Sequence, residues 1–378
     1  MDSLTQAVLG GAVGTAVAGK ALGRRAALWG AVGGTLPDLD VLAYPFLDTA
    51  GELLFHRGLT HGLAFSLVAG PALAWLSIRL ARWRARRRGE PPPEARWRAW
   101  LALWTAALLT HPLLDVFTVY GTQLLAPFSA RPFAIGSVFI IDPLYTVPLA
   151  LFLAAAVVQR RPRLAAVGLA VGLVYLGWSV AAQTVVERRA RAALGDGRQL
   201  VTPMPLQTLL WRVVVEEGDR VATYEHSLLG PAWLFERAGS SPRAELPASR
   251  GAETLRWFSR GWLVAEHAAA DASADAVGVA DARFGCGPGG AYVFRWRVAP
   301  GGALEQQPFA TRATGDAART LLRRVLHADP VPPPLPCPAS QPPTPPSRPA
   351  PNRSDPRSFE NAPRSPETVP QTTQPPAP

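Results

Sequence analysis

The stretch that decides the fold begins GLAFSLVAGPALAWLSIRLA at residues 62–81 and continues RWRARRR at residues 82–88. The first part is apolar over about 20 residues, the length that an α-helix needs to cross the hydrocarbon core of a bilayer. The second part is basic, and membrane proteins keep arginine and lysine on the cytoplasmic side. Together they predict a transmembrane helix that enters from outside near Gly62 and ends in the cytoplasm.

Further apolar segments lie on both sides of this one. Hydrophobic residues make up 48% of the 378-residue chain and charged residues only 17%, against roughly 25% in an average soluble domain. Because Met1-Asp2-Ser3 has no positive charge, we expect the first segment to be kept rather than cleaved as a signal peptide. We predict an α-helical polytopic membrane bundle with spans near Leu4–Gly19, Ala26–Leu36, Gly62–Ala81, Ala99–Phe117, Val138–Val158 and Leu164–Ala182.

The first two segments are short and rich in glycine. The four-residue spacing of Gly10 and Gly14, and of Gly30 and Gly34, allows helices to approach closely. This spacing favours packing inside the bundle. The two segments either span the membrane or form a re-entrant pair.

Basic residues cluster in alternate loops, which sets the topology. Such loops stay in the cytoplasm, so residues 37–61 and 120–137 are expected outside, as is everything after about residue 183. The orientation of the later segments holds whether or not the first two cross the membrane. The basic residues are Lys20, Arg24 and Arg25 after the first segment, those from Arg82 to Arg98 after the third, and Arg160, Arg161 and Arg163 after the fifth.

The chain changes character after the membrane domain of residues 1–190. Residues 191–328 are predicted to form a smaller β-rich (α+β) extracytoplasmic domain, and residues 329–378 a proline-rich, disordered tail. Cys286 and Cys337 have no CxxC or CxxH spacing, so neither a thiolate zinc site nor a disulfide is expected. The strand-like runs are Leu209–Val215, Arg220–Leu229, Thr254–Trp262, Val277–Phe284 and Ala291–Val298, with a turn at Glu216–Asp219.

The net charge of +10 does not indicate nucleic-acid binding, because the arginines lie mainly in short loops between apolar segments and in the tail. Membrane lipids are the expected partners. HExxH, GxSxG and P-loop motifs are missing from the sequence, which leaves zinc-protease, serine-hydrolase and nucleoside-triphosphate chemistry without support.

Aspartate and histidine motifs fall at the predicted outer ends of the segments. They include three of the six histidines, and the charge rule that brings them to one face was applied without reference to them. Ionisable groups at membrane depth are costly and generally functional. The motif residues are Asp38 and Asp40 after the second segment, His56 and His61 before the third, His111 and Asp115 in the fourth, and Asp142 before the fifth.

Each of these residues also has a structural interpretation. Asp142 before Pro143 suits a helix N-cap, and Asp2 before Ser3-Leu4-Thr5-Gln6 fits a capping box; for both, capping is favoured. For the others the alternatives are a helix end at Asp38, a solvated Asp40, a loop position for His56, a first helical turn after Thr60 for His61, and an ordinary hydrogen-bonded pair for His111 and Asp115.

Taken together, the set matches the chemistry of a divalent metal ion. Imidazoles and carboxylates are ligands for zinc, or for manganese or iron where carboxylates dominate. A cation neutralises clustered carboxylates and lowers the pKa of a bound water to about 7, which yields a hydroxide nucleophile. A remaining carboxylate then serves as general base.

The same motifs give the chain a resemblance to a known family, the LexA-regulated inner-membrane metal-dependent hydrolases. The resemblance covers roughly residues 1–300, and many members carry histidine where this chain has Gln6. It implies a multi-pass protein of the bacterial cytoplasmic (inner) membrane and metal-dependent hydrolysis. The matching stretches are Met1–Gln6, Leu36–Asp40, His56–His61 and His111–Asp115, with Thr202–Pro205, Leu209–Trp211 and Asp281–Gly285 similar to the C-terminal domain of one branch.

The prediction is an integral-membrane metal-dependent hydrolase with its active site at the outer face. The HxxxD spacing is also similar to that of zinc phospholipase C and S1/P1-type nucleases, which suggests phosphoester or lipid-linked substrates. The alternatives are a metal-binding or transport protein without hydrolysis, and a structural scaffold. The predicted metal ligands are His56, His61, His111, Asp115 and Asp38; the predicted catalytic residues are Asp38 and Asp40, which activate water, and Arg57, which holds an anionic headgroup or phosphate.

Overall fold

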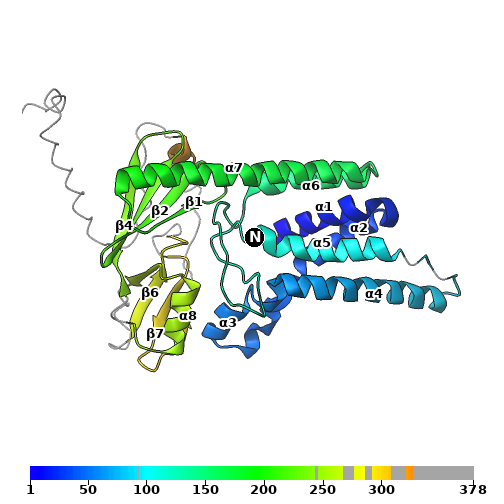
Figure 1. Ribbon diagram of the computed structural model, residues 1–378, viewed down its shortest axis with the longest axis horizontal. Helices are drawn as coiled ribbons and strands as arrows, with labels where there is room; N and C mark the ends of the chain where they lie inside the picture. The colour runs from blue at the N-terminus through cyan, green and yellow to red at the C-terminus, as the bar shows by residue number, and fades with distance from the viewer. Residues whose placement is uncertain are drawn as a thin grey trace, which may run out of the picture. The chain divides into compact units, whose positions relative to one another are not determined.

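The computed structural model describes residues 1–91, 93–94, 96–242, 246–266, 276–285, 292–307 and 321–326. The predicted disordered tail and both cysteines lie outside these residues. A helical N-terminal region is followed by a region that contains two sheets (Figure 1).

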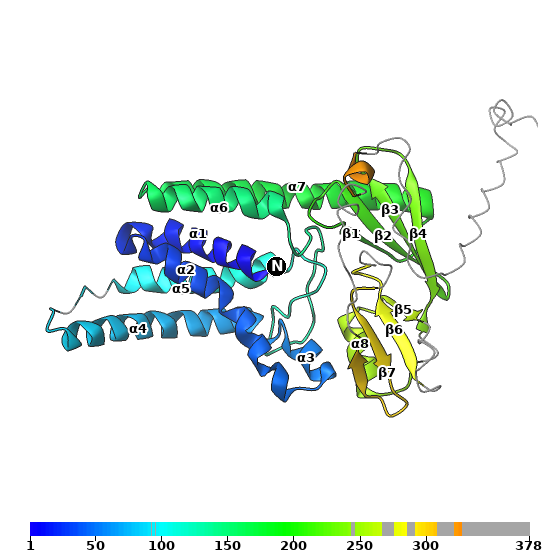
Figure 2. The same cartoon turned by 180° about the vertical axis from the view of Figure 1, so that it is seen from behind.

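Helices occupy all six apolar segments. Among the described residues, α4 and α7 are long and apolar enough to cross a membrane, and α6 is a shorter apolar helix. Helix α1 packs against α2, α5, α6 and α7 (Figure 2). The helices are α1 (Ser3–Leu22), α2 (Arg25–Thr35), α4 (Leu63–Arg87), α5 (Trp97–Asp115), α6 (Pro143–Val158) and α7 (Pro162–Leu194).

The glycines of α1 and α2 face one another, as their spacing predicts. A Cβ added to Gly10 would press on the Gly30 carbonyl oxygen and lie 2.7 Å from the Gly34 Cα. One added to Gly14 would lie 2.6 Å from the Ala26 carbonyl oxygen. The two helix backbones are therefore in direct contact.

The segment between α2 and α4, predicted as an outer loop, is mostly helical. Pro37 stands at the start of η1, a 3₁₀-helix over Pro37–Phe46. It is followed by α3 (Thr49–Phe55), where the Asp48 side chain accepts a hydrogen bond from the Gly51 backbone N–H at 2.7 Å, and by η2 (Leu59–His61). These short turns fix the positions of the aspartate and histidine motifs.

Two antiparallel sheets make up the second region, each with its strands in sequence order. The hairpin predicted around Glu216–Asp219 is present, with Glu217 opposite Arg220. The first sheet holds β1 (Gln199–Pro203), β2 (Leu210–Glu217), β3 (Arg220–Ser227) and β4 (Trp233–Ser240); the second holds β5 (Leu263–Glu266), β6 (Val277–Asp281), β7 (Arg295–Val298) and β8 (Leu304–Gln306).

A helix covers one face of each sheet. The last turns of α7 bury Ala182, Val186 and Ala190 against the first sheet, in a core that includes Trp211. Helix α8 (Arg250–Phe258) packs Leu255 and other apolar residues onto the second sheet.

The prediction of a strand over Thr254–Trp262 is wrong, because most of this segment belongs to α8. Ser249 caps that helix by accepting a hydrogen bond from the Ala252 N–H, and Leu255 and Phe258 repeat at helical spacing on its buried face. Capping and helical periodicity outweigh the aromatic and β-branched content of the segment.

The glycine contact yields a stability prediction with opposite signs at two sites. Gly10→Ala should lower the free energy of unfolding by about 1–3 kcal/mol, because the added methyl overpacks the α1–α2 contact. Gly177→Ala, at an exposed site of α7 with nothing within 4 Å of the added Cβ, should raise it by about 0.5–1 kcal/mol. Thermal unfolding of the detergent-solubilised protein measures both, and equal stability of the two variants would contradict the packing.

Candidate metal centre

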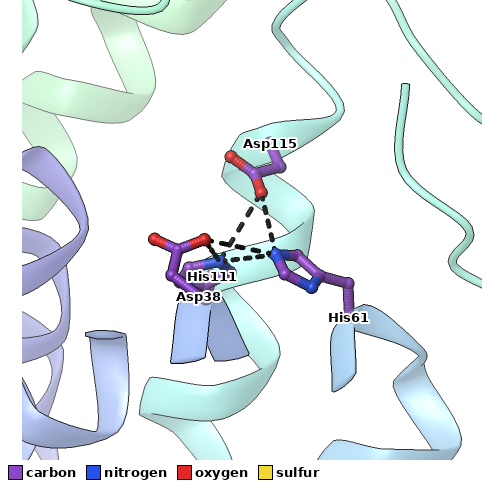
Figure 3. A group of neighbouring side chains, drawn as sticks. All are labelled: Asp38, His61, His111 and Asp115. Atoms are coloured by element: carbon purple, nitrogen blue, oxygen red, sulfur yellow. Dashed lines mark hydrogen bonds and ion pairs between the residues drawn. The ribbon is translucent and has the colours of Figure 1, made fainter. Parts of the chain in front are cut away.

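Four side chains from three elements converge on one point (Figure 3). Asp38 comes from η1, His61 from η2, and His111 and Asp115 lie one turn apart on α5. One ligand atom from each lies within 4.8 Å of all the others, and all the side chains except Asp38 are fully buried. The group can hold a metal ion.

The spacing of these atoms suits a single cation. His61 Nε2 and His111 Nε2 are 3.0 Å apart, and each lies 3.4–3.5 Å from Asp38 Oδ1 and Asp115 Oδ2. Four ligands placed tetrahedrally at about 2.0–2.2 Å from a zinc ion are about 3.3–3.6 Å from one another. The four histidine–carboxylate distances match that arrangement, the two imidazoles are slightly closer, and the two carboxylate oxygens lie within 4.8 Å of each other.

The proton positions on the two histidines also favour a cation. His111 Nδ1 lies 2.5 Å from the Gly34 carbonyl oxygen, which can only accept, so its proton is on Nδ1 and Nε2 carries a lone pair. The Thr60 hydroxyl donates to Asp40 and lies 3.1 Å from His61 Nδ1, so Thr60 accepts from Nδ1, and Nε2 of a neutral His61 also carries a lone pair. Two lone pairs therefore face each other, and either an added proton or a metal ion removes the repulsion.

Asp115 divides its two oxygens between different neighbours. Oδ1 accepts hydrogen bonds from Gln6 Nε2 at 3.0 Å and from the amino group of Met1, and it pairs with Arg57 at 3.3 Å. Oδ2 is buried without a hydrogen-bond donor and faces the histidines. A buried acceptor without a donor is costly, and a cation at the centre would satisfy it.

The charges around the cluster shift its pKa values. Burial alone raises the pKa of Asp38, but hydrogen bonds with His111 and His61 outweigh burial and leave it below its ordinary value. Burial lowers the pKa of His61, while Asp115 and Asp38 raise it, and the net shift is upward. Without a metal, the protonated form of His61 is therefore favoured more than in a free imidazole, and an incoming metal ion competes with that proton.

Asp40 and His56 lie beside the cluster and not in it. Asp40 accepts hydrogen bonds from the Arg57 backbone N–H at 3.0 Å and from Thr60 Oγ1 at 3.4 Å, and its other oxygen lies 3.0 Å from His56 Nδ1. It therefore orients His56 directly, and His61 through the Thr60 hydroxyl, which lies 3.1 Å from His61 Nδ1. The prediction that His56 ligates the metal stays a prediction, and in this structure its ring contacts Asp40.

Arg57 joins the cluster to the loop that follows α5. Its guanidinium is buried between Asp115, the Thr118 hydroxyl at 2.9 Å and the ring of Tyr120 at 4.8 Å. The backbone of Arg57 has φ 57°, a strained value outside glycine. Its role as a headgroup ligand remains a prediction.

Asp2 and Asp142 lie outside the metal cluster and cap helices. Asp2 accepts a hydrogen bond from the Thr5 N–H of α1, and Asp142 accepts from the Leu144 N–H of α6 and from the Tyr175 hydroxyl. Gln6 was not among the predicted site residues, although it contacts Asp115. The signal that could have identified Gln6 was its position in the first matching stretch, Met1–Gln6.

Comparison with known proteins supports an inner-membrane location. The inner membrane protein YbcI of Escherichia coli (strain K12) is 32% identical over 118 residues, which cover 31% of this chain and 61% of YbcI. The uncharacterized protein YfhP of Bacillus subtilis (strain 168) is 31% identical over 154 residues, which cover 38% of this chain and 42% of YfhP. The chain thus spans less than two thirds of either relative.

No solved structure matches the chain. None of these names states a metal, an activity or LexA regulation. The whole metal cluster lies in residues 1–186, and that part of the chain matches the family model described as YdjM inner membrane protein.

Proposed function

We propose that this chain is a multi-pass inner-membrane hydrolase that binds a divalent metal ion at Asp38, His61, His111 and Asp115. The observation that carries the proposal is the pair of imidazole Nε2 atoms, 3.0 Å apart and flanked by two carboxylates. Two imidazoles and two carboxylates suit zinc, and the carboxylates also admit manganese or iron.

The bound metal would supply Lewis-acid activation of a water molecule. Asp38 is 17% exposed and is the ligand through which solvent reaches the cluster. Its second oxygen is the carboxylate oxygen best placed to take a proton from water, because both oxygens of Asp40 are engaged by His56, Arg57 and Thr60. Asp40 thus acts by holding His61.

The proposed topology places the cluster at the outer face of the membrane. Helix α4 starts just after His61 and ends among arginines, and α5 starts among arginines and ends at Asp115. The positive-inside rule puts the arginine ends in the cytoplasm. The proposed substrates, phosphoesters or lipid-linked compounds, would then reach the site from the outer leaflet.

The second sheet and α8 support a role in covering the site. The Tyr120 ring lies 5.4 Å from the ring of His56 and 4.9 Å from that of Phe258 in α8. Arg283 donates hydrogen bonds to the carbonyl oxygens of Val119 and Tyr120. The β-rich region is therefore positioned to restrict which substrates approach.

A second candidate function is metal binding or transport without hydrolysis. This function is favoured because both oxygens of Asp40 are already engaged. Asp38 is then the one carboxylate of the cluster near solvent, and no separate carboxylate is left to act as general base. In that case Asp38→Asn would act only through any metal affinity that it removes, whereas hydrolysis would be lost even in Asp38→Asn protein that retains the metal.

Metal content tests the cluster directly. The purified wild type should carry about one divalent ion per chain at the cluster, and His111→Ala should lose it, because one of four ligands is gone. His226→Ala, the same change in β3 away from the cluster, should keep the metal. Elemental analysis of the detergent-purified protein measures this, and unchanged metal in folded His111→Ala protein would rule out the site.

The orienting role of Asp40 gives a graded prediction. Asp40→Asn should weaken metal affinity about 10–100-fold, since losing the partner of a ligating histidine has an effect of that size. Asp219→Asn, an exposed carboxylate in the β2–β3 turn, should have no effect. Competition with a chelator of known affinity measures both; equal affinities would leave Asp40 without this role.

Hydrolysis is tested with the reconstituted, metal-loaded protein and synthetic phosphodiesters with and without lipid tails. We expect release of the alcohol, at least about 100-fold slower in Asp38→Asn, because that change removes the proposed base. Metal retention in the same variant distinguishes loss of catalysis from loss of the ion. Metal-replete wild type that releases no product from either ester would favour the non-hydrolytic function.

A further inference from the structure

A second polar site lies at the other end of α1. A partly open cavity of about 400 Å³ is lined by the α1–α2 turn and the α6–α7 turn, which lie side by side at the end of the helices far from the sheets (Figures 1 and 2). Its lining combines apolar residues such as Leu22 and Val157 with Arg24, Arg25 and Arg160.

The charge of this cavity is uncompensated within the described part of the chain. No acidic residue lines it, and none of its three arginines takes part in an ion pair there. Arg24 donates from Nε to the Val157 carbonyl oxygen at 3.3 Å, which ties the two turns together. The neighbouring cavity differs, because Glu94 lines it and pairs with Arg96 at 3.1 Å.

Two helices begin at the same place. Helix α2 starts at Arg25 and α7 at Pro162, and neither has a side-chain cap at its N-terminus. Pro162 has no N–H, and the N–H groups of Ala26 and Leu164 bond the carbonyl oxygens of Gly23 and Arg161. The remaining first-turn N–H groups and the positive ends of the two helix dipoles form a combination that binds phosphate.

A buried hydroxyl points to a ligand independently of the charges. Thr15 lines the cavity, is 4% exposed, and its Oγ1 has no hydrogen-bond partner among the described residues. An orphan polar atom in an apolar wall is costly unless a ligand or water satisfies it.

The depth of the cavity indicates where the ligand comes from. Gln6 contacts the metal cluster and Gly23 lines the cavity. At 1.5 Å per residue, about 25 Å along the axis of α1 therefore separates the cluster from the cavity. This is close to the thickness of the hydrocarbon core, about 30 Å. With the cluster at one membrane face, the cavity lies at the headgroup level of the other.

We propose that this cavity binds the phosphate headgroup of an anionic phospholipid from the cytoplasmic leaflet. The arginines and helix N-termini contact the phosphate, Thr15 donates its hydroxyl proton to the headgroup, and the apolar wall accommodates the start of an acyl chain. The site is separate from the metal centre, so His111→Ala protein should bind the lipid as wild type does.

The test is titration of the full-length protein in a zwitterionic detergent with phosphatidylglycerol, phosphatidylcholine and inorganic phosphate, followed by native mass spectrometry. Phosphatidylglycerol should bind, and Arg24→Gln/Arg25→Gln/Arg160→Gln should weaken its affinity at least tenfold. Thr15→Val, which preserves shape, should weaken it severalfold. The matched control is Arg82→Gln/Arg84→Gln/Arg86→Gln, which removes the same charge from the end of α4.

Three results would overturn the proposal. Equal weakening in the α4 control would assign the binding to general surface charge. Displacement of the lipid by millimolar inorganic phosphate would make the site one for free phosphate. Unchanged affinity in both the triple variant and Thr15→Val would exclude the cavity, and melting temperatures in phosphatidylcholine confirm that the variants are folded.

Discussion

The ion pair between Arg57 and Asp115 is the contact on which the rest of the site depends. A fully buried carboxylate costs several kcal/mol unless charges and hydrogen bonds compensate it. Here the compensation comes from Arg57 before η2, from Gln6 on α1 and from Met1 just before that helix, while Asp115 itself ends α5. These contacts together join three parts of the chain, and the second oxygen of Asp115 is left facing the histidines.

Hydropathy and small-residue spacing predicted much of the helical region. Each apolar segment contains a helix, and the glycines of α1 and α2 make the backbone contact that their spacing indicated. Both signals are local, since a helix displays its pattern within a few turns. Whether all the helices span the membrane depends on the bilayer, and α1, α2 and α5 are not among the candidate spans in the described residues.

The sequence motifs named the residues of the cluster but not their individual contacts. His56 and His61 are five positions apart, yet the backbone becomes extended at His56 and left-handed at Arg57 before η2 begins. The two rings consequently lie 6.0 Å apart and meet different partners. Spacing alone could not reveal this break, nor that Asp38 would lie beside Nε2 of His61 and Asp40 beside its Nδ1, because both depend on contacts between segments that are distant in the sequence.

The length of helix α7 links the membrane to the first sheet. At 1.5 Å per residue its 33 residues are about 50 Å long, about 20 Å more than the hydrocarbon core requires. The last part of the helix packs against the first sheet through Ala182, Val186 and Ala190, and the helix continues into it without a break. In the proposed topology, a thinner bilayer would increase the tilt of α7. Because the first sheet is packed on the end of the helix, the sheet would change its orientation together with it. Membrane thickness would thereby change how closely the β-rich region covers the metal cluster.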